Sequence, residues 1–150
     1  MKRLQLSVFV MLSFACPLFL AAQEKGEWSA KSSNAKTITG DIGIFDNKIT
    51  IALLNFPLAQ IRSLETAELT AAFDADPGGA GHLYRLGIAA TQRFLHKNTL
   101  CGTEGVEWMA TYVQGKNLHV SFFSNPKPPV FTFESLNNSE DLCGSFLYVR

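Results

Sequence analysis

The tripeptide Leu-Cys-Gly occurs twice, at residues 100–102 and 142–144, and the most strand-like part of the sequence lies between the two copies. A disulfide between Cys101 and Cys143 would join the start of this segment to its last strand, and no other feature restricts the possible folds as much. We expect such a bond to stabilise the fold by about 2–4 kcal/mol, mostly by restricting the unfolded chain. The alternative is a pair of unpaired, buried thiols, which an oxidising compartment disfavours.

A β-hairpin is predicted directly after the first of these cysteines. Polar residues alternate with aromatic, β-branched and other apolar residues over residues 106–113, where Trp108 and Tyr112 share a face. The alternation resumes after a turn that contains Gly115, a residue type that adopts positive φ without strain. The two stretches together predict a hairpin over residues 106–124.

The remainder of this half alternates loops and short strands. Three prolines in residues 125–129 lack the hydrogen-bond donors that a central strand needs, so this segment is predicted to be a stiff, exposed loop. Residues 130–133 and 142–150 are predicted to be strands, and the polar residues 137–141 are predicted to be the loop that precedes the last one.

Residues 1–22 have the features of a secretory signal peptide. Lys2 and Arg3 precede a mostly apolar stretch, and two alanines supply small side chains for cleavage before Gln23. A retained membrane anchor is the alternative, although Pro17 interrupts the apolar stretch.

Lipid modification of Cys16 is a third interpretation, but Ser13 stands where the lipoprotein pattern prefers leucine. Cleavage would remove Cys16 and leave an even pair of cysteines, as an oxidising compartment favours. We therefore expect a periplasmic or secreted protein with no membrane span after cleavage. It would consist of a polar N-terminal segment (residues 23–36) and a single β-rich domain (residues 37–150).

The polar segment, residues 23–36, is predicted to be a loose tail or a first edge strand. Between this segment and Cys101 the residue pattern changes several times. Further predictions are a hairpin over residues 37–54, a break at Pro57, a short strand over 58–64, a helix over 65–73, a strand over 82–88 and a second short helix over 89–98. Seven to eight strands with two short helices indicate an all-β, or β-rich α+β, domain. It would fold as a small antiparallel barrel or sandwich with one disulfide.

The sequence contains no strong metal, cofactor or catalytic motif. Asp74 and Asp76 lie in a glycine-rich turn, but Gly78 and Arg85 occupy positions at which a calcium loop needs oxygen ligands. The histidines, which lie on separate predicted elements, are His82, His96 and His119. A site that combines one of these histidines with Asp74 or Asp76 remains as the hypothesis of an enzyme or metal protein.

The overall charge argues against nucleic-acid binding. The chain has 13 basic and 13 acidic residues, without the excess of positive charge that such proteins carry. Four cations nevertheless lie close together in the predicted strand and helix before Cys101: Arg85, Arg93, His96 and Lys97. They form either an anion-binding patch or the solvated C-terminal end of the predicted helix.

Residues 26–28 form a G-x-W motif near the expected mature N-terminus, and Arg150 ends the last predicted strand. This combination resembles lipocalin-like barrels, which often place a basic residue on the last strand against the tryptophan. The resemblance implies a barrel in which the inward aromatic residues, such as Trp108, Tyr112 and Phe122, line a ligand cavity or fill a solid core. The general plan is also similar to small exported β-domain proteins of Gram-negative bacteria, a group with no activity to carry over.

These observations favour an exported, non-enzymatic β domain that binds a small apolar ligand or a protein partner, without a cofactor. An alternative is an envelope inhibitor or interaction module, because binding residues concentrate on loops. Its contact loop would comprise Pro126, Lys127, Pro128 and Pro129.

Overall fold

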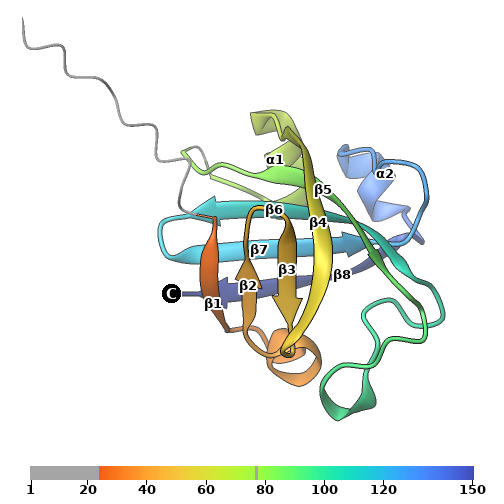
Figure 1. Cartoon of the computed structure of the whole chain (residues 1–150). Coiled ribbons are helices and arrows are strands. Elements are labelled where there is room, and N and C mark those ends of the chain that lie inside the picture. Colours follow the sequence, from red (N-terminus) through yellow and green to blue (C-terminus); the bar gives the residue numbers. More distant parts are fainter. Residues whose placement is uncertain (1–23, 77) are drawn as a thin grey trace, which may run out of the picture.

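The computed structural model describes residues 24–76 and 78–150, which form a closed barrel of eight antiparallel strands in chain order (Figure 1). The strands are β1 (Gly26–Ala30), β2 (Ile42–Ile44), β3 (Lys48–Ile51), β4 (Leu54–Ser63), β5 (His82–Ile88), β6 (Val106–Gln114), β7 (Asn117–Phe123) and β8 (Leu142–Val149). The predicted β-rich fold class is confirmed, and the choice between barrel and sandwich is settled as a barrel. The predicted signal peptide, residues 1–22, lies outside the described residues.

Short helical segments lie in the longer connections between strands. They are the π-helical turn η1 (Ala35–Thr39), the helix α1 (Thr66–Phe73), the 3₁₀ turn η2 (Leu95–Lys97) and the helix α2 (Phe133–Asn137). Within the part of the chain that the structure describes, no helix has the length and apolar character needed to cross a membrane.

The polar N-terminal segment contributes a strand to the barrel. Within β1, Trp28 pairs with Ile42 of β2, and Ser29 pairs with Val149 of β8. This strand therefore has a neighbour on each side and closes the barrel, so it is neither a loose tail nor an edge strand.

The predicted hairpin over residues 106–124 is confirmed as β6 and β7. Gln114 pairs with Asn117, which leaves a two-residue turn, and Gly115 has the expected positive φ of 58°. The predicted helix over residues 65–73 is likewise confirmed as α1. Its first turn carries a capping box in which Glu65 N donates to Glu68 Oε2 at 2.9 Å.

The predicted strand over residues 130–133 is wrong, because the chain turns into α2 instead. Thr132 has an extended backbone and caps the helix, since its Oγ1 accepts a hydrogen bond from Ser135 N at 3.2 Å. Val130 and Phe131 look like strand residues in the sequence, yet no neighbouring strand is available to pair with them.

The predicted helix over residues 89–98 is also wrong. Phe94 has an extended backbone, and both His96 and Lys97 have positive φ, at 54° and 63°. Phe94 packs its ring 5.8 Å from that of Phe56 and joins the barrel core. This tertiary contact overrides the local helical pattern.

The predicted hairpin over residues 37–54 is partly confirmed. β2 and β3 pair around the expected turn at residues 46–47, where Phe45 N donates to Lys48 O at 2.9 Å. Residues 37–39 belong to η1 and not to a strand.

Pro57 does not break the sheet, and β4 runs through it. Leu58 N donates to Asn47 O on the β3 side at 3.0 Å. Successive amides in a strand point to opposite sides, so the nitrogen of Pro57 faces β5, whose pairing with β4 begins only at Leu58. Proline therefore removes no hydrogen bond at this position.

Two separate apolar layers stabilise the fold. Trp28, Phe122 and Tyr148 lie in the barrel interior, each no more than 1% exposed. A second layer lies between the outer surface of β5–β7 and the segments that carry α1 and α2, where Leu69 and Phe131 contribute buried side chains. Alternate residues of β6 serve the two layers, because neighbouring side chains in a strand point to opposite faces.

Candidate binding groove

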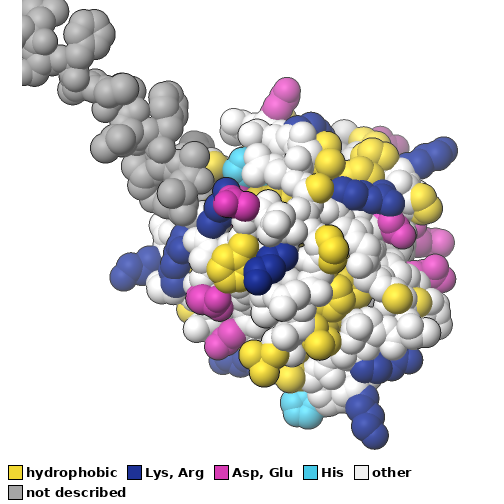
Figure 2. All heavy atoms as spheres, in the orientation of Figure 1, with side chains coloured by type: hydrophobic (Ala, Val, Ile, Leu, Met, Phe, Trp, Pro, Cys, Tyr) yellow, Lys and Arg dark blue, Asp and Glu magenta, His cyan; other side chains and the backbone are white. Residues whose placement is uncertain are grey.

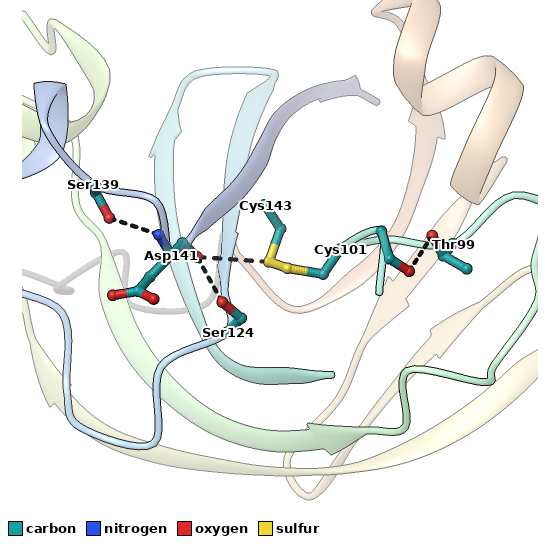
Figure 3. Close-up of a disulfide and its surroundings, with 7 residues drawn as sticks. Thr99, Cys101, Ser124, Ser139, Asp141 and Cys143 are labelled. Carbon is teal, nitrogen blue, oxygen red and sulfur yellow. Dashed lines mark hydrogen bonds between the residues drawn. A yellow bond between two sulfur atoms is a disulfide. The ribbon is translucent and has the colours of Figure 1, made fainter. Parts of the chain in front are cut away.

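The predicted disulfide between Cys101 and Cys143 is present and supports one side of the candidate site (Figure 3). The two Cα atoms are 4.6 Å apart, although the cysteines are 42 positions apart in the sequence. Cys101 lies in the connection between β5 and β6, and Cys143 lies at the start of β8. The bond therefore holds the end of the β7–β8 connection against a neighbouring loop.

Asp141 joins the two ends of the β7–β8 connection. Its backbone oxygen accepts hydrogen bonds from Ser124 N at 2.9 Å and from Ser124 Oγ at 3.4 Å, and lies 3.7 Å from Cys143 Sγ (Figure 3). Its backbone nitrogen donates to Ser139 Oγ at 3.1 Å, and its Oδ2 accepts from Asn125 Nδ2 at 2.9 Å. These contacts close the base of the loop beside the disulfide.

A groove with a volume of about 550 Å³ lies within this connection, on the outside of the barrel. Its apolar lining comes from Phe123, Pro128, Pro129, Val130 and Leu136. Its polar lining includes Asn125, Lys127, Asn138, Ser139, Glu140 and Asp141. The volume falls within the range of about 300–1,000 Å³ that is typical of ligand sites.

Apolar side chains are exposed beside this groove. Val130 is 61% exposed and Phe133 is 57% exposed, whereas Phe131 between them is buried. The ring of Phe131 packs edge-on against Phe123, with centroids 5.9 Å apart. Phe131 therefore anchors the segment, while Val130 and Phe133 remain free to contact another molecule.

Arg85 supports the predicted contact loop from the barrel wall. Its Nη1 donates to Pro126 O at 3.1 Å, its Nη2 pairs with Glu107, and its guanidinium lies 4.7 Å from the ring centroid of Trp108. Arg85 is therefore engaged here and does not join Arg93, His96 and Lys97 in an anion-binding patch.

The G-x-W motif and Arg150 meet at the opposite end of the barrel. The guanidinium of Arg150 lies 4.0 Å from the ring centroid of Trp28, and its Nη1 donates to Lys25 O at 2.9 Å. Gly26 has a φ of 113°, and a Cβ there would lie 3.3 Å from Arg150 Nη1. Glycine is therefore favoured by the backbone conformation, and an added Cβ would also require the end of the Arg150 side chain to shift slightly.

His82 belongs to a buried polar cluster at this same end. Its Nδ1 lies 2.5 Å from Glu24 Oε2, which also accepts a hydrogen bond from Tyr84 OH at 3.0 Å. The hydrogen bond with Glu24 raises the pKa of His82, and burial together with the Glu24 charge raises the pKa of Tyr84.

The three histidines do not form a shared site. His96 lies on the loop that contains η2, and His119 lies on β7 against the rings of Phe73 and Tyr112, where burial lowers the pKa of His119. In residues 24–76 and 78–150, no three His, Cys, Asp or Glu side chains are arranged to hold a metal ion.

The three aromatic residues predicted to face a ligand do not lie together. Phe122 points into the barrel, but Trp108 and Tyr112 belong to the outer layer. Tyr112 also donates its hydroxyl hydrogen to Asp76 O at 2.9 Å.

No protein-family model, curated protein or solved structure matches this chain. The fold and the site therefore define a structural class of protein, which is a small, closed antiparallel β-barrel with an external groove beside a disulfide.

The side of the groove that Ser135 and Leu136 contribute was missed because α2 was not predicted. Val130 and Phe133 were assigned to a strand that would have hidden alternate side chains. The Thr132–Ser135 capping pair was the local signal of a helix start.

Proposed function

We propose that this protein is an exported, non-enzymatic binding domain whose site is the groove between residues 126–129 and α2. Its partner is an extended segment of another protein. The observation that carries the proposal is the exposure of Val130, which lines a groove that is already formed, together with the exposure of Phe133 in the same segment. Large apolar side chains exposed at the edge of a polar surface are typical of interaction sites.

The composition of the groove suits a protein segment. Pro128, Pro129 and Leu136 offer an apolar surface on which the partner's side chains lose contact with water. Asn138 and Glu140 offer polar groups to the partner's backbone amides and carbonyls. The prolines stiffen the loop before binding, which reduces the conformational entropy that is lost in the complex.

Export is supported by the signal-like residues 1–22 and by the disulfide, because structural disulfides persist in oxidising compartments. The contact between Trp28 and Arg150 supports a likeness to lipocalin-like barrels, since it pairs the two residues on which the resemblance was based.

Binding of an apolar ligand inside the barrel has less support. Phe122 does face the interior, but it packs edge-on against Phe146 with ring centroids 5.5 Å apart. Trp28 and Tyr148 are fully buried in the same cluster. We expect no saturable signal when an apolar fluorescent probe is titrated into the protein, and saturable binding that survives Phe133→Ser would favour the interior site instead.

Crosslinking in producing cells tests the groove directly. A photoreactive amino acid at position 133 of the exported protein should give discrete crosslinked products, whereas the same group at Lys116, on the β6–β7 turn, should not. Val130→Asp should lower the yield at position 133 by about tenfold, as expected for loss of a central apolar contact.

Val130→Asp should leave the thermal midpoint unchanged, because Val130 is 61% exposed. Identical products from both positions, or products that are insensitive to Val130→Asp, would contradict the proposed site.

A further inference from the structure

Four connections leave the end of the barrel where β1 finishes. One of them, between β7 and β8, carries the proposed groove; the other three are residues 31–41, the turn at residues 52–53, and residues 89–105. His96 Nδ1 and Asn98 Nδ2 each lie 3.2 Å from Thr37 O, which joins the first and third connections. Ile42 pairs with Ile51, which brings the turn beside the end of the first connection. We call this surface the basic end, and it is distinct from the proposed groove.

Exposed cations gather on the basic end. Lys36, Arg93 and Lys97 are all exposed, and within the described ranges none of them has a carboxylate within 4.0 Å. Arg93 donates only to backbone carbonyls, those of Ala90 and Gln92. The acidic residues on these connections are Asp41 and Glu104, and Asp41 Oδ1 already accepts a hydrogen bond from Ala30 N at 2.8 Å.

The positive charge of residues 93–97 is not explained by the end of a helix. Cations at the C-terminus of a helix are stabilised by the helix dipole, but residues 89–98 do not form the predicted helix. His96 and Lys97 instead take positive φ in succession, a conformation that is uncommon for lysine, although histidine adopts it more often. The backbone thus holds both side chains outward from the barrel, where they are exposed.

An exposed leucine lies at the tip of the adjacent turn. Leu53 is 92% exposed and Leu54 is 41% exposed. Ala52 and Leu53 both have positive φ, at 49° and 68°, in a two-residue hairpin turn that asparagine and glycine would form with less strain. Residues held in sparsely populated backbone conformations cluster at functional sites.

We propose that the basic end docks on a membrane surface that carries anionic lipid headgroups. The cations would lie at the level of the phosphates, and Leu53 would enter the boundary between headgroups and acyl chains. Figure 2 shows hydrophobic, histidine and basic side chains near one another at the lower end of the molecule. Basic charge beside an exposed apolar tip is the combination that binds proteins to the interface without spanning the bilayer.

Vesicle co-sedimentation of the exported protein tests this proposal. Binding to phosphatidylcholine vesicles with one-third phosphatidylglycerol should exceed binding to pure phosphatidylcholine by about tenfold or more and should fall at high salt. Arg93→Gln and Lys97→Gln should each lower the partition coefficient by about fivefold. Leu53→Asn should lower it by a similar factor without lowering the thermal midpoint, because asparagine suits positive φ.

Two matched variants serve as controls. Ile61→Asn changes an apolar residue of β4 that is 53% exposed, and Lys116→Gln removes an exposed cation from the β6–β7 turn. Neither should change vesicle binding. Leu53→Trp supplies a direct reporter, since Trp28 and Trp108 are 1% and 7% exposed, and its emission should shift to the blue only with anionic vesicles.

Equal binding to neutral and anionic vesicles would overturn the proposal, as would equal losses in the control variants. Binding to a soluble polyanion such as dextran sulfate that matches vesicle binding and ignores Leu53→Asn would also overturn it, because the surface would then recognise charge without lipid.

Discussion

The two ends of the barrel use their side chains in opposite ways. At one end, which we call the anchored end, Trp28 is covered by Arg150, and Glu24 Oε2 receives hydrogen bonds from His82 and Tyr84. At the basic end, Lys36, Arg93 and Lys97 have no carboxylate partner among the residues that the structure describes, and Leu53 is exposed at a strained turn. Groups that satisfy one another stabilise the fold, whereas groups left unsatisfied at a surface are available to another molecule.

The groove resembles the basic end in this respect. Phe131 is buried and holds its segment in place, but Val130 and Phe133 on either side are exposed. The disulfide ties the groove to the loop that carries the cations of the basic end. One covalent link therefore supports both candidate interaction surfaces.

The largest expected difference in stability lies between a residue of the anchored end and an exposed residue beside the groove. Trp28→Ala at the anchored end should lower the free energy of unfolding by about 3–5 kcal/mol, because it removes a fully buried aromatic side chain. Phe133→Ala beside the groove should change it by less than about 0.5 kcal/mol. Urea denaturation of the two variants measures both values, and similar losses would mean that the groove is part of the structural core.

Loss of the disulfide is expected to have the next largest effect. Reduction, or replacement of Cys101 and Cys143 by alanine, should lower the free energy of unfolding by about 2–4 kcal/mol. Denaturation with and without a reductant measures the change, and the double alanine variant should not respond to the reductant. An unchanged wild-type curve under reducing conditions would contradict a stabilising role for the bond.

The two ends should respond with opposite signs to changes at residues with positive φ. Ala52→Asn combined with Leu53→Gly should raise the free energy of unfolding by about 1 kcal/mol, because both new residues suit the hairpin turn. Gly26→Ala should lower it by about 1–2 kcal/mol, since its φ is 113° and its Cβ would meet Arg150. Thermal unfolding reports both shifts, and a gain from Gly26→Ala would contradict the cost assigned to the positive φ at this position.

The smallest effect concerns pH at the anchored end. The pKa of His82 is raised by Glu24, so the folded state holds this proton more tightly than the unfolded state, whose histidine pKa is about 6.5. The stabilisation is therefore complete below pH 6.5 or so and is lost as the pH rises through the folded pKa of His82.

His119 behaves in the opposite way, because burial lowers its pKa. Its contribution to stability is present above the unfolded pKa and is lost as the pH falls through the folded pKa of His119.

Comparing the free energy of unfolding of wild type and His82→Gln between about pH 6 and pH 9 isolates the contribution of His82. A difference that grows with rising pH would contradict the pairing of His82 with Glu24.

Local sequence patterns predicted the secondary structure correctly where neighbouring residues determine it. The β6–β7 hairpin follows from alternation around Gly115, and α1 follows from its acidic first turn and apolar face. Local patterns failed at residues 89–98, where the burial of Phe94 against Phe56 outweighs helical propensity. They failed again at α2, because strand-like residues need a pairing partner that the fold does not supply there.

The sequence alone predicted the β-rich class and the cysteine pair, because alternating apolar residues and paired cysteines have few structural alternatives. The contact between Trp28 and Arg150 was implied only by the resemblance to lipocalin-like barrels. Only the tertiary structure decided that β1 closes a barrel, that Trp108 and Tyr112 lie outside it, and that Leu53 and the exposed cations share one end. These features depend on which distant segments meet, and such contacts are set by the packing of the whole chain and not by the order of neighbouring residues.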